Sequence, residues 1–129
     1  MPREPDSEIW SEYIRIKHEL MDYDCNLREA IGNIRIRMAM NSGRSKMMEL
    51  FAKAQKHVGM ILDLGLSCGA IPSDADKEEI NFAEKVSKGN WRSVEDFERC
   101  QRFFRNSYIK TKFYSVTREK QRMLAPHEV

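Results

Sequence analysis

The chain has 129 residues, of which 41% are hydrophobic and 33% are charged, and its formal net charge at pH 7 is +2. This length suits a single domain, and the apolar fraction is too high for a disordered chain. No run approaches 18 apolar residues and the first residues carry no apolar stretch, so we expect neither a membrane-spanning helix nor a signal peptide.

The first predicted helix runs from about residue 7 to about residue 41 and has the most regular apolar pattern in the chain. Its stripe follows heptad-like intervals of four and three, and consists of Ile9, Tyr13, Ile16, Leu20, Tyr23, Leu27, Ala30 and Ile34. Thirty residues of helix extend about 45 Å, which is longer than a small domain is wide. We therefore expect a homodimer or a subunit of a larger assembly. The predicted oligomer interface comprises Trp10, Tyr13, Ile16, Leu20, Tyr23 and Leu27.

The second predicted helix runs from about residue 45 to residue 66, with Phe51, Val58 and Ile61 on its apolar face. The turn before it contains Gly43, a residue that commonly follows the end of a helix. The two helices are therefore predicted to form an antiparallel hairpin.

Two further helices are predicted from capping signals. Ser73 with Asp76 resembles a capping box for a short helix that ends before Gly89, and Ser93 with Asp96 repeats the signature. The predicted fold is an all-α, four-helix arrangement with long first and fourth helices. It forms one domain over residues 1–129, with 1–6 and 125–129 frayed.

The fourth helix changes its apolar face after Tyr108. Phe97, Phe104 and Tyr108 share one face, whereas Ile109 and Phe113 lie on another. A straight helix cannot bury both faces against one core. Either the helix breaks near residues 106–107, or its second half binds something other than the core of its own domain.

Basic and aromatic residues alternate in the same segment. Eight cations and one acid, Glu119, lie between Arg99 and Arg122. Cations bind phosphate, and aromatic rings stack on bases. The predicted nucleic-acid-binding residues are Lys110, Lys112, Phe113, Tyr114, Arg118, Lys120 and Arg122, joined by Arg35, Arg37, Arg44 and Lys46 near the hairpin turn.

Charge is distributed in blocks along the chain. Residues 1–32 and 57–98 are acidic, whereas residues 33–56 and 99–129 are basic. The basic blocks either gather on one binding face or pair with the acidic blocks inside the fold, and the sequence does not separate these two possibilities.

The predicted function is that of a non-enzymatic, nucleic-acid-binding accessory or regulatory protein. The alternative is a protein-interaction module or inhibitor, which docks on an acidic protein surface through the long first helix and the aromatic C-terminal segment. No nucleophile, base and orienting group can be named together, so neither catalytic residues nor a cofactor are predicted.

The three cysteines, Cys25, Cys68 and Cys100, are an odd number and far apart in the chain. We expect reduced thiols and a cytoplasmic protein, because a disulfide framework favours an even set. No cysteine or histidine lies at a recognised zinc-ligand spacing, and no metal site is predicted.

Overall fold

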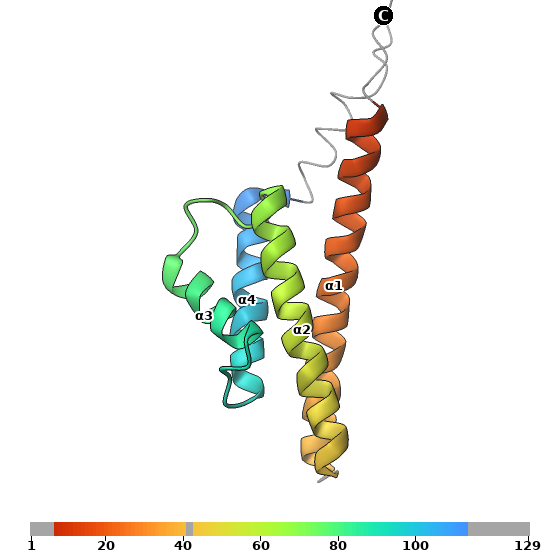
Figure 1. Cartoon of the computed structure of the whole chain (residues 1–129), viewed down its shortest axis with the longest axis vertical. Coiled ribbons are helices and arrows are strands. Elements are labelled where there is room, and N and C mark those ends of the chain that lie inside the picture. Colours follow the sequence, from red (N-terminus) through yellow and green to blue (C-terminus); the bar gives the residue numbers. More distant parts are fainter. Residues whose placement is uncertain (1–6, 41–42, 114–129) are drawn as a thin grey trace, which may run out of the picture.

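The computed structural model describes residues 7–40 and 43–113, which form four helices and no strand within those ranges (Figure 1). The helices are α1 (Ser7–Ala39), α2 (Arg44–Cys68), α3 (Lys77–Ser87) and α4 (Val94–Thr111). The predicted all-α, four-helix arrangement is confirmed.

The predicted antiparallel hairpin of α1 and α2 is also confirmed. Leu20, Leu27 and Ile34 of α1 and Val58 and Ile61 of α2 are fully buried in one core, as expected from their helical spacing. Among the described helices, α4 packs against α1, α2 and α3, whereas α3 contacts only α2 and α4. Figure 1 shows that both ends of α1 extend beyond α3 and α4. The lower end of the hairpin is therefore a two-helix projection.

The end of α2 depends on two glycines. Gly69 adopts a left-handed conformation, with φ of 82°, and ends the helix. A Cβ atom at Gly65 would lie 2.8 Å from the side chain of Ile71, so only glycine lets the loop fold back onto α2 at this point. The Ile71 amide donates to the Gly65 carbonyl at 2.9 Å, and the Ile71 side chain is buried.

The start of α3 corrects a sequence-based prediction. The N-cap is Asp76 rather than Ser73, and its carboxylate accepts a hydrogen bond from the Glu78 amide at 2.9 Å. Residues 72–75 form a separate turn, in which the Ala75 amide donates to the Pro72 carbonyl at 3.0 Å. The helix after Ser93 begins as predicted, although Asp96 accepts from the Arg92 amide and not from that of Ser93.

Aromatic side chains fasten the loop between α3 and α4 to α2. Trp91 stacks on Phe51 with ring centroids 4.5 Å apart, and both rings contact Phe97. The Trp91 indole also donates to the Gln55 side chain at 2.9 Å, which satisfies its only polar group. This contact positions the first turn of α4 against the core.

The C-terminal end of α4 resolves the change of apolar face. The helix continues through residues 106–107 and ends at Thr111, because Lys112 takes a left-handed conformation with φ of 53°. This reversal turns Phe113 back into the core, where it is 5% exposed, and leaves Ile109 69% exposed. The Thr111 hydroxyl lies 2.8 Å from the Ser107 carbonyl of its own helix and 3.1 Å from the Ala70 carbonyl, so this end of α4 lies beside the loop after α2.

Candidate functional site

The residues predicted as an oligomer interface lie largely inside the fold. Leu20 and Leu27 are fully buried by other helices of the same chain. Tyr13 contacts Phe113 with ring centroids 6.3 Å apart, and Tyr23 contacts His57 at 6.2 Å. Ile16 is partly buried, and the side chain of Trp10 is outside the described part of the structure. The heptad-like stripe thus serves the core of its own domain.

Three of the basic residues pair with acids from other elements of the fold, two from helices and one from the turn before α3. Arg35 pairs with Glu98, and its guanidinium lies 3.6 Å from Glu95. The hydrogen bond from Arg35 to Glu98 raises the pKa of Arg35. Arg99 likewise pairs with Glu79, and Lys110 lies 3.9 Å from Asp74. The basic and acidic blocks therefore pair in part, as one of the two sequence-based possibilities requires.

The other predicted nucleic-acid-binding residues fall into separate places. Phe113 is buried and offers no free ring to a base in this arrangement. Lys112 is exposed at the end of α4, and Lys46 is exposed near the start of α2. Arg37 is partly exposed, and the side chain of Arg44 is not described. Tyr114, Arg118, Lys120 and Arg122 lie outside the described residues.

A basic surface forms instead along the seam between α1 and α4. It consists of Arg28 from α1 and Arg105 from α4, whose charges both act on Asp24, and of Arg102, which lies one helical turn before Arg105. We call it the α1–α4 basic face. All three side chains are exposed. Among residues 7–40 and 43–113, none of the three has an acidic group within ion-pair distance.

Asp24 lies within this basic face. Its carboxyl group is partly buried, and this burial raises its pKa because the charged form is poorly solvated. The positive charges of Arg105 and Arg28 oppose the rise. Two arginines from different helices therefore act on one carboxylate.

Arg28, Arg102 and Arg105 are not among the binding residues predicted from the sequence. The interval of three between Arg102 and Arg105, with no acid from Arg99 to Phe113, is a signal that could have identified the α4 pair. Arg28 had no such signal, since it lies in an acidic block and reaches the face only through the packing of α1 on α4.

Two open depressions lie between α1 and α2, on a different side of α1 from the α1–α4 basic face. The lower one, near the hairpin turn, measures about 260 Å³ and is lined by Asn33, Ile36, Arg37, Met40 and Leu50. The upper one measures about 350 Å³ and is lined by Glu19, Tyr23, Met60, Asp63, Leu64 and Ser67. Neither is large for a small-molecule site.

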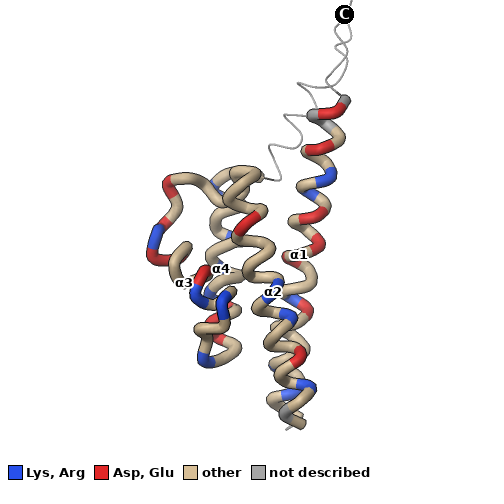
Figure 2. The backbone as a smooth tube through the Cα atoms, viewed as in Figure 1, with Lys and Arg blue, Asp and Glu red and all other residues tan. Residues whose placement is uncertain are grey.

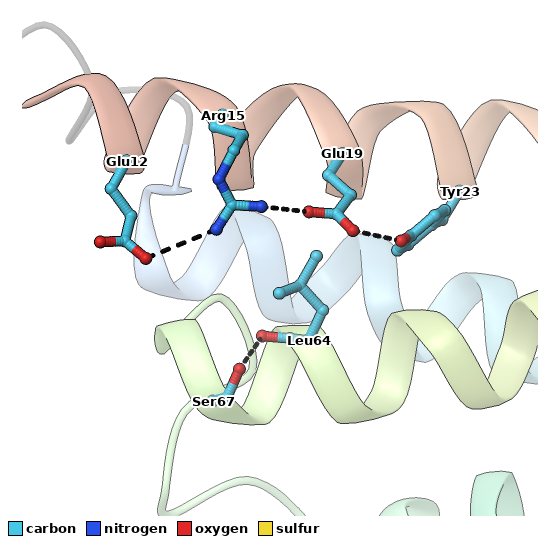
Figure 3. Close-up of polar contacts among 6 residues, drawn as sticks. All are labelled: Glu12, Arg15, Glu19, Tyr23, Leu64 and Ser67. Atoms are coloured by element: carbon cyan, nitrogen blue, oxygen red, sulfur yellow. Dashed lines mark hydrogen bonds and ion pairs between the residues drawn. The ribbon is translucent and has the colours of Figure 1, made fainter.

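Figure 3 shows the polar side chains beside the upper depression. Arg15 lies 3.4 Å from Glu12 and 3.1 Å from Glu19, and the Tyr23 hydroxyl donates to Glu19. Across the groove, the Ser67 hydroxyl donates to the Leu64 carbonyl at 3.0 Å. The upper rim of α1 is thus a connected, mainly acidic row of side chains.

The described part of the chain contains no group of three or more His, Cys, Asp or Glu side chains that could hold a metal ion. The imidazole of His57 lies 2.8 Å from the Lys53 carbonyl, within α2. None of the described helices has the length and apolarity needed to cross a membrane.

A functional conclusion for this protein rests on the surfaces described above, because comparison with known proteins supplies no relative. No family model, no curated protein and no solved structure matches this chain.

Proposed function

We propose that this protein is a non-enzymatic, nucleic-acid-binding accessory or regulatory protein that contacts phosphates through its α1–α4 basic face. The observation that carries the proposal is the position of Arg28, Arg102 and Arg105. All three are exposed and none forms an ion pair among the described residues, whereas Arg35 and Arg99 of the same fold are paired with acids. Cations left without an acidic partner are the groups that release counterions on binding a polyanion.

Lys112 at the end of α4 is a further exposed cation. Arg118, Lys120 and Arg122 follow it in the sequence, outside the described residues. Arg102 and Arg105 are one helical turn apart, and this spacing lets both side chains contact the phosphate backbone of one nucleic-acid molecule. Contacts of this kind position a protein without reading bases, so we expect binding with little sequence preference.

A second candidate function is a protein-interaction module that binds an acidic protein surface. Large apolar side chains at the hairpin end support it, since Met40 is 71% exposed, Ile36 56% and Met48 53%. Exposed apolar groups of this size are typical of protein interfaces and are not needed for phosphate contacts. We rank this candidate second because the exposed apolar side chains at the hairpin end do not account for the arginines of the α1–α4 basic face.

The proposal places the protein in the cytoplasm. Cys25, Cys68 and Cys100 are free thiols, which suit a reducing compartment.

Fluorescence anisotropy with labelled duplex and single-stranded DNA and RNA tests the proposal. The full chain should bind with an affinity that falls steeply with salt. The double variant R102A/R105A should reduce the slope of log K against log salt by about two units on duplex DNA and weaken all sequences alike. Circular dichroism should remain unchanged, because both side chains are exposed.

The matched control is K85A/K88A, which removes the same charge from exposed positions on and just after α3. It should leave the slope unchanged. If the wild-type chain does not bind any of the four nucleic acids at low salt, the proposal is wrong and the protein-interaction candidate takes its place. An equal decrease of the salt slope in R102A/R105A and K85A/K88A would show that only the overall charge matters. That result would also contradict binding through the α1–α4 basic face.

A further inference from the structure

The outer side of the α1–α2 hairpin carries opposite charge at its two ends. Near the turn, exposed or partly exposed cations outnumber acids: Arg37, Lys46, Lys53 and Lys56 against Glu29 and Glu49. Toward the other end, acids outnumber cations: Glu8, Glu12, Glu19, Asp22 and Asp63 against Arg15. Figure 2 shows the same separation along the hairpin. We call this surface the α1–α2 face.

Each end also has an apolar depression. Ile36 and Met40 line the lower, basic one, and they are 56% and 71% exposed. Met60 and Leu64 line the upper, acidic one and are partly exposed. Uncovered apolar side chains of this size favour burial against another surface.

We propose that a second copy of this chain docks antiparallel on the α1–α2 face. In that arrangement the acidic end of each copy lies over the basic end of the other, and each apolar depression is covered. A twofold dimer requires a surface that is complementary to itself, and a face with opposite charges at its two ends meets that requirement.

The charge pattern distinguishes a second copy from other occupants. An acidic helix of an unrelated protein would complement the lower end only and would meet repulsion from Glu19 and Asp63 at the upper end. Two copies that met end to end at their hairpin turns would bring Arg37 and Lys46 of each close together, which like-charge repulsion disfavours. Of these three arrangements, the antiparallel pairing is the one that satisfies both ends.

The proposed dimer leaves the α1–α4 basic face accessible. Tyr13, Asp24 and Arg35 interact with residues of or beside α4, and they recur every eleven residues, about three turns of helix. Glu19 and Arg37 lie at least about a third of a turn away from that row. The proposal is therefore independent of nucleic-acid binding.

Charge reversal with light scattering on the full chain tests the dimer. The wild-type protein should have a mass of about twice the 15.2 kDa of one chain. The variant R37E/K46E makes both ends acidic, and D22K/D63K removes the net negative charge of the acidic end. Each variant alone should dimerise at least about tenfold more weakly, because twofold symmetry repeats every lost attraction and every new like-charge contact. An equimolar mixture of the two should recover the dimer as a heterodimer.

Substitutions at these four positions should leave the fold intact. None of the four residues takes part in an ion pair among the residues the structure describes, and the Glu12–Arg15–Glu19–Tyr23 row is left intact. The control K85E/K88E changes exposed positions on α3 and the residue after it, and should keep the wild-type mass. Circular dichroism should be the same for all variants.

Three results would overturn the proposal. One is a wild-type monomer at concentrations up to about 100 μM. The second is a dimer that neither charge-reversed variant weakens, which would place the interface elsewhere. The third is a mixture of the two variants that stays monomeric although both are folded.

Discussion

The three cysteines have different environments and therefore different reactivities. Cys25 is exposed, Cys68 is partly buried, and Cys100 is 1% exposed in the core. Burial raises the pKa of the Cys100 thiol to about 12, and the nearby carboxylates of Glu79 and Asp96 add to the rise. Because the thiolate is the reactive form, Cys100 is almost wholly unreactive near neutral pH.

We predict that iodoacetamide at pH 8 modifies Cys25 first and leaves Cys100 unmodified until the chain is unfolded. Peptide mass spectrometry after timed labelling measures the order, and the same reaction in urea is the control. Labelling of Cys100 as fast as Cys25 in the native protein would mean that α4 separates from the core.

The partly buried Asp24 links pH to stability. Burial raises the pKa of the Asp24 carboxyl group in the folded protein. Ionised Asp24 therefore lowers the free energy of unfolding at neutral pH, and this loss of stability develops as the pH rises through the pKa of Asp24. The variant Asp24→Asn should therefore unfold at slightly higher urea than wild type at pH 7. The gain should shrink as pH falls toward the ordinary Asp pKa of about 3.9.

The same substitution should strengthen nucleic-acid binding, because it removes a negative charge between Arg28 and Arg105. Its control is Asp22→Asn at an exposed neighbouring position, where neither effect is expected. A clear loss of stability in Asp24→Asn at pH 7 would show that the attraction to the two arginines outweighs the cost of burial.

The end of α4 provides a test at the level of one element. Phe113 is buried between Tyr13 and Tyr108, with ring centroids 6.3 and 6.0 Å away, whereas Ile109 on the last turn is 69% exposed. Phe113→Ala should lower the free energy of unfolding by about 3 kcal/mol, because it leaves a cavity in the core. Ile109→Ala should change it by less than about 0.5 kcal/mol.

Urea denaturation followed by circular dichroism measures both changes. Equal effects of the two substitutions would place Phe113 outside the core. The sequence-based prediction that Phe113 stacks on a base would then be tested by measuring the binding of the Phe113→Ala variant to single strands.

The whole molecule presents two surfaces on different sides of α1, and this separation predicts independent effects. R102A/R105A should lower the salt slope of nucleic-acid binding and leave the mass in light scattering unchanged. R37E/K46E should lower the mass and leave the salt slope per chain unchanged. Measuring both properties on both variants completes the comparison, and a single variant that alters both would mean that the two surfaces overlap.

The number, order and approximate ends of the helices could be predicted from the sequence. Apolar residues at intervals of three and four determine which segments bury a helix face, and that information is local. Gly43 and Ser93 mark boundaries through backbone and capping preferences, which are also local. The start of α3 was misplaced because Ser73 and Asp76 offer two capping residues, and the turn at Pro72–Ala75 decides between them.

Which residues share a surface was decided only by the tertiary structure. The predicted interface residues Leu20 and Leu27 are covered by the chain's own helices, and Phe113 turns inward at Lys112. Arg35 finds its partner Glu98 63 residues away, which leaves the basic face to Arg28, Arg102 and Arg105. Helical periodicity describes the faces of one helix, but a surface between two helices depends on which faces pack together, and residues far apart in the chain determine that packing.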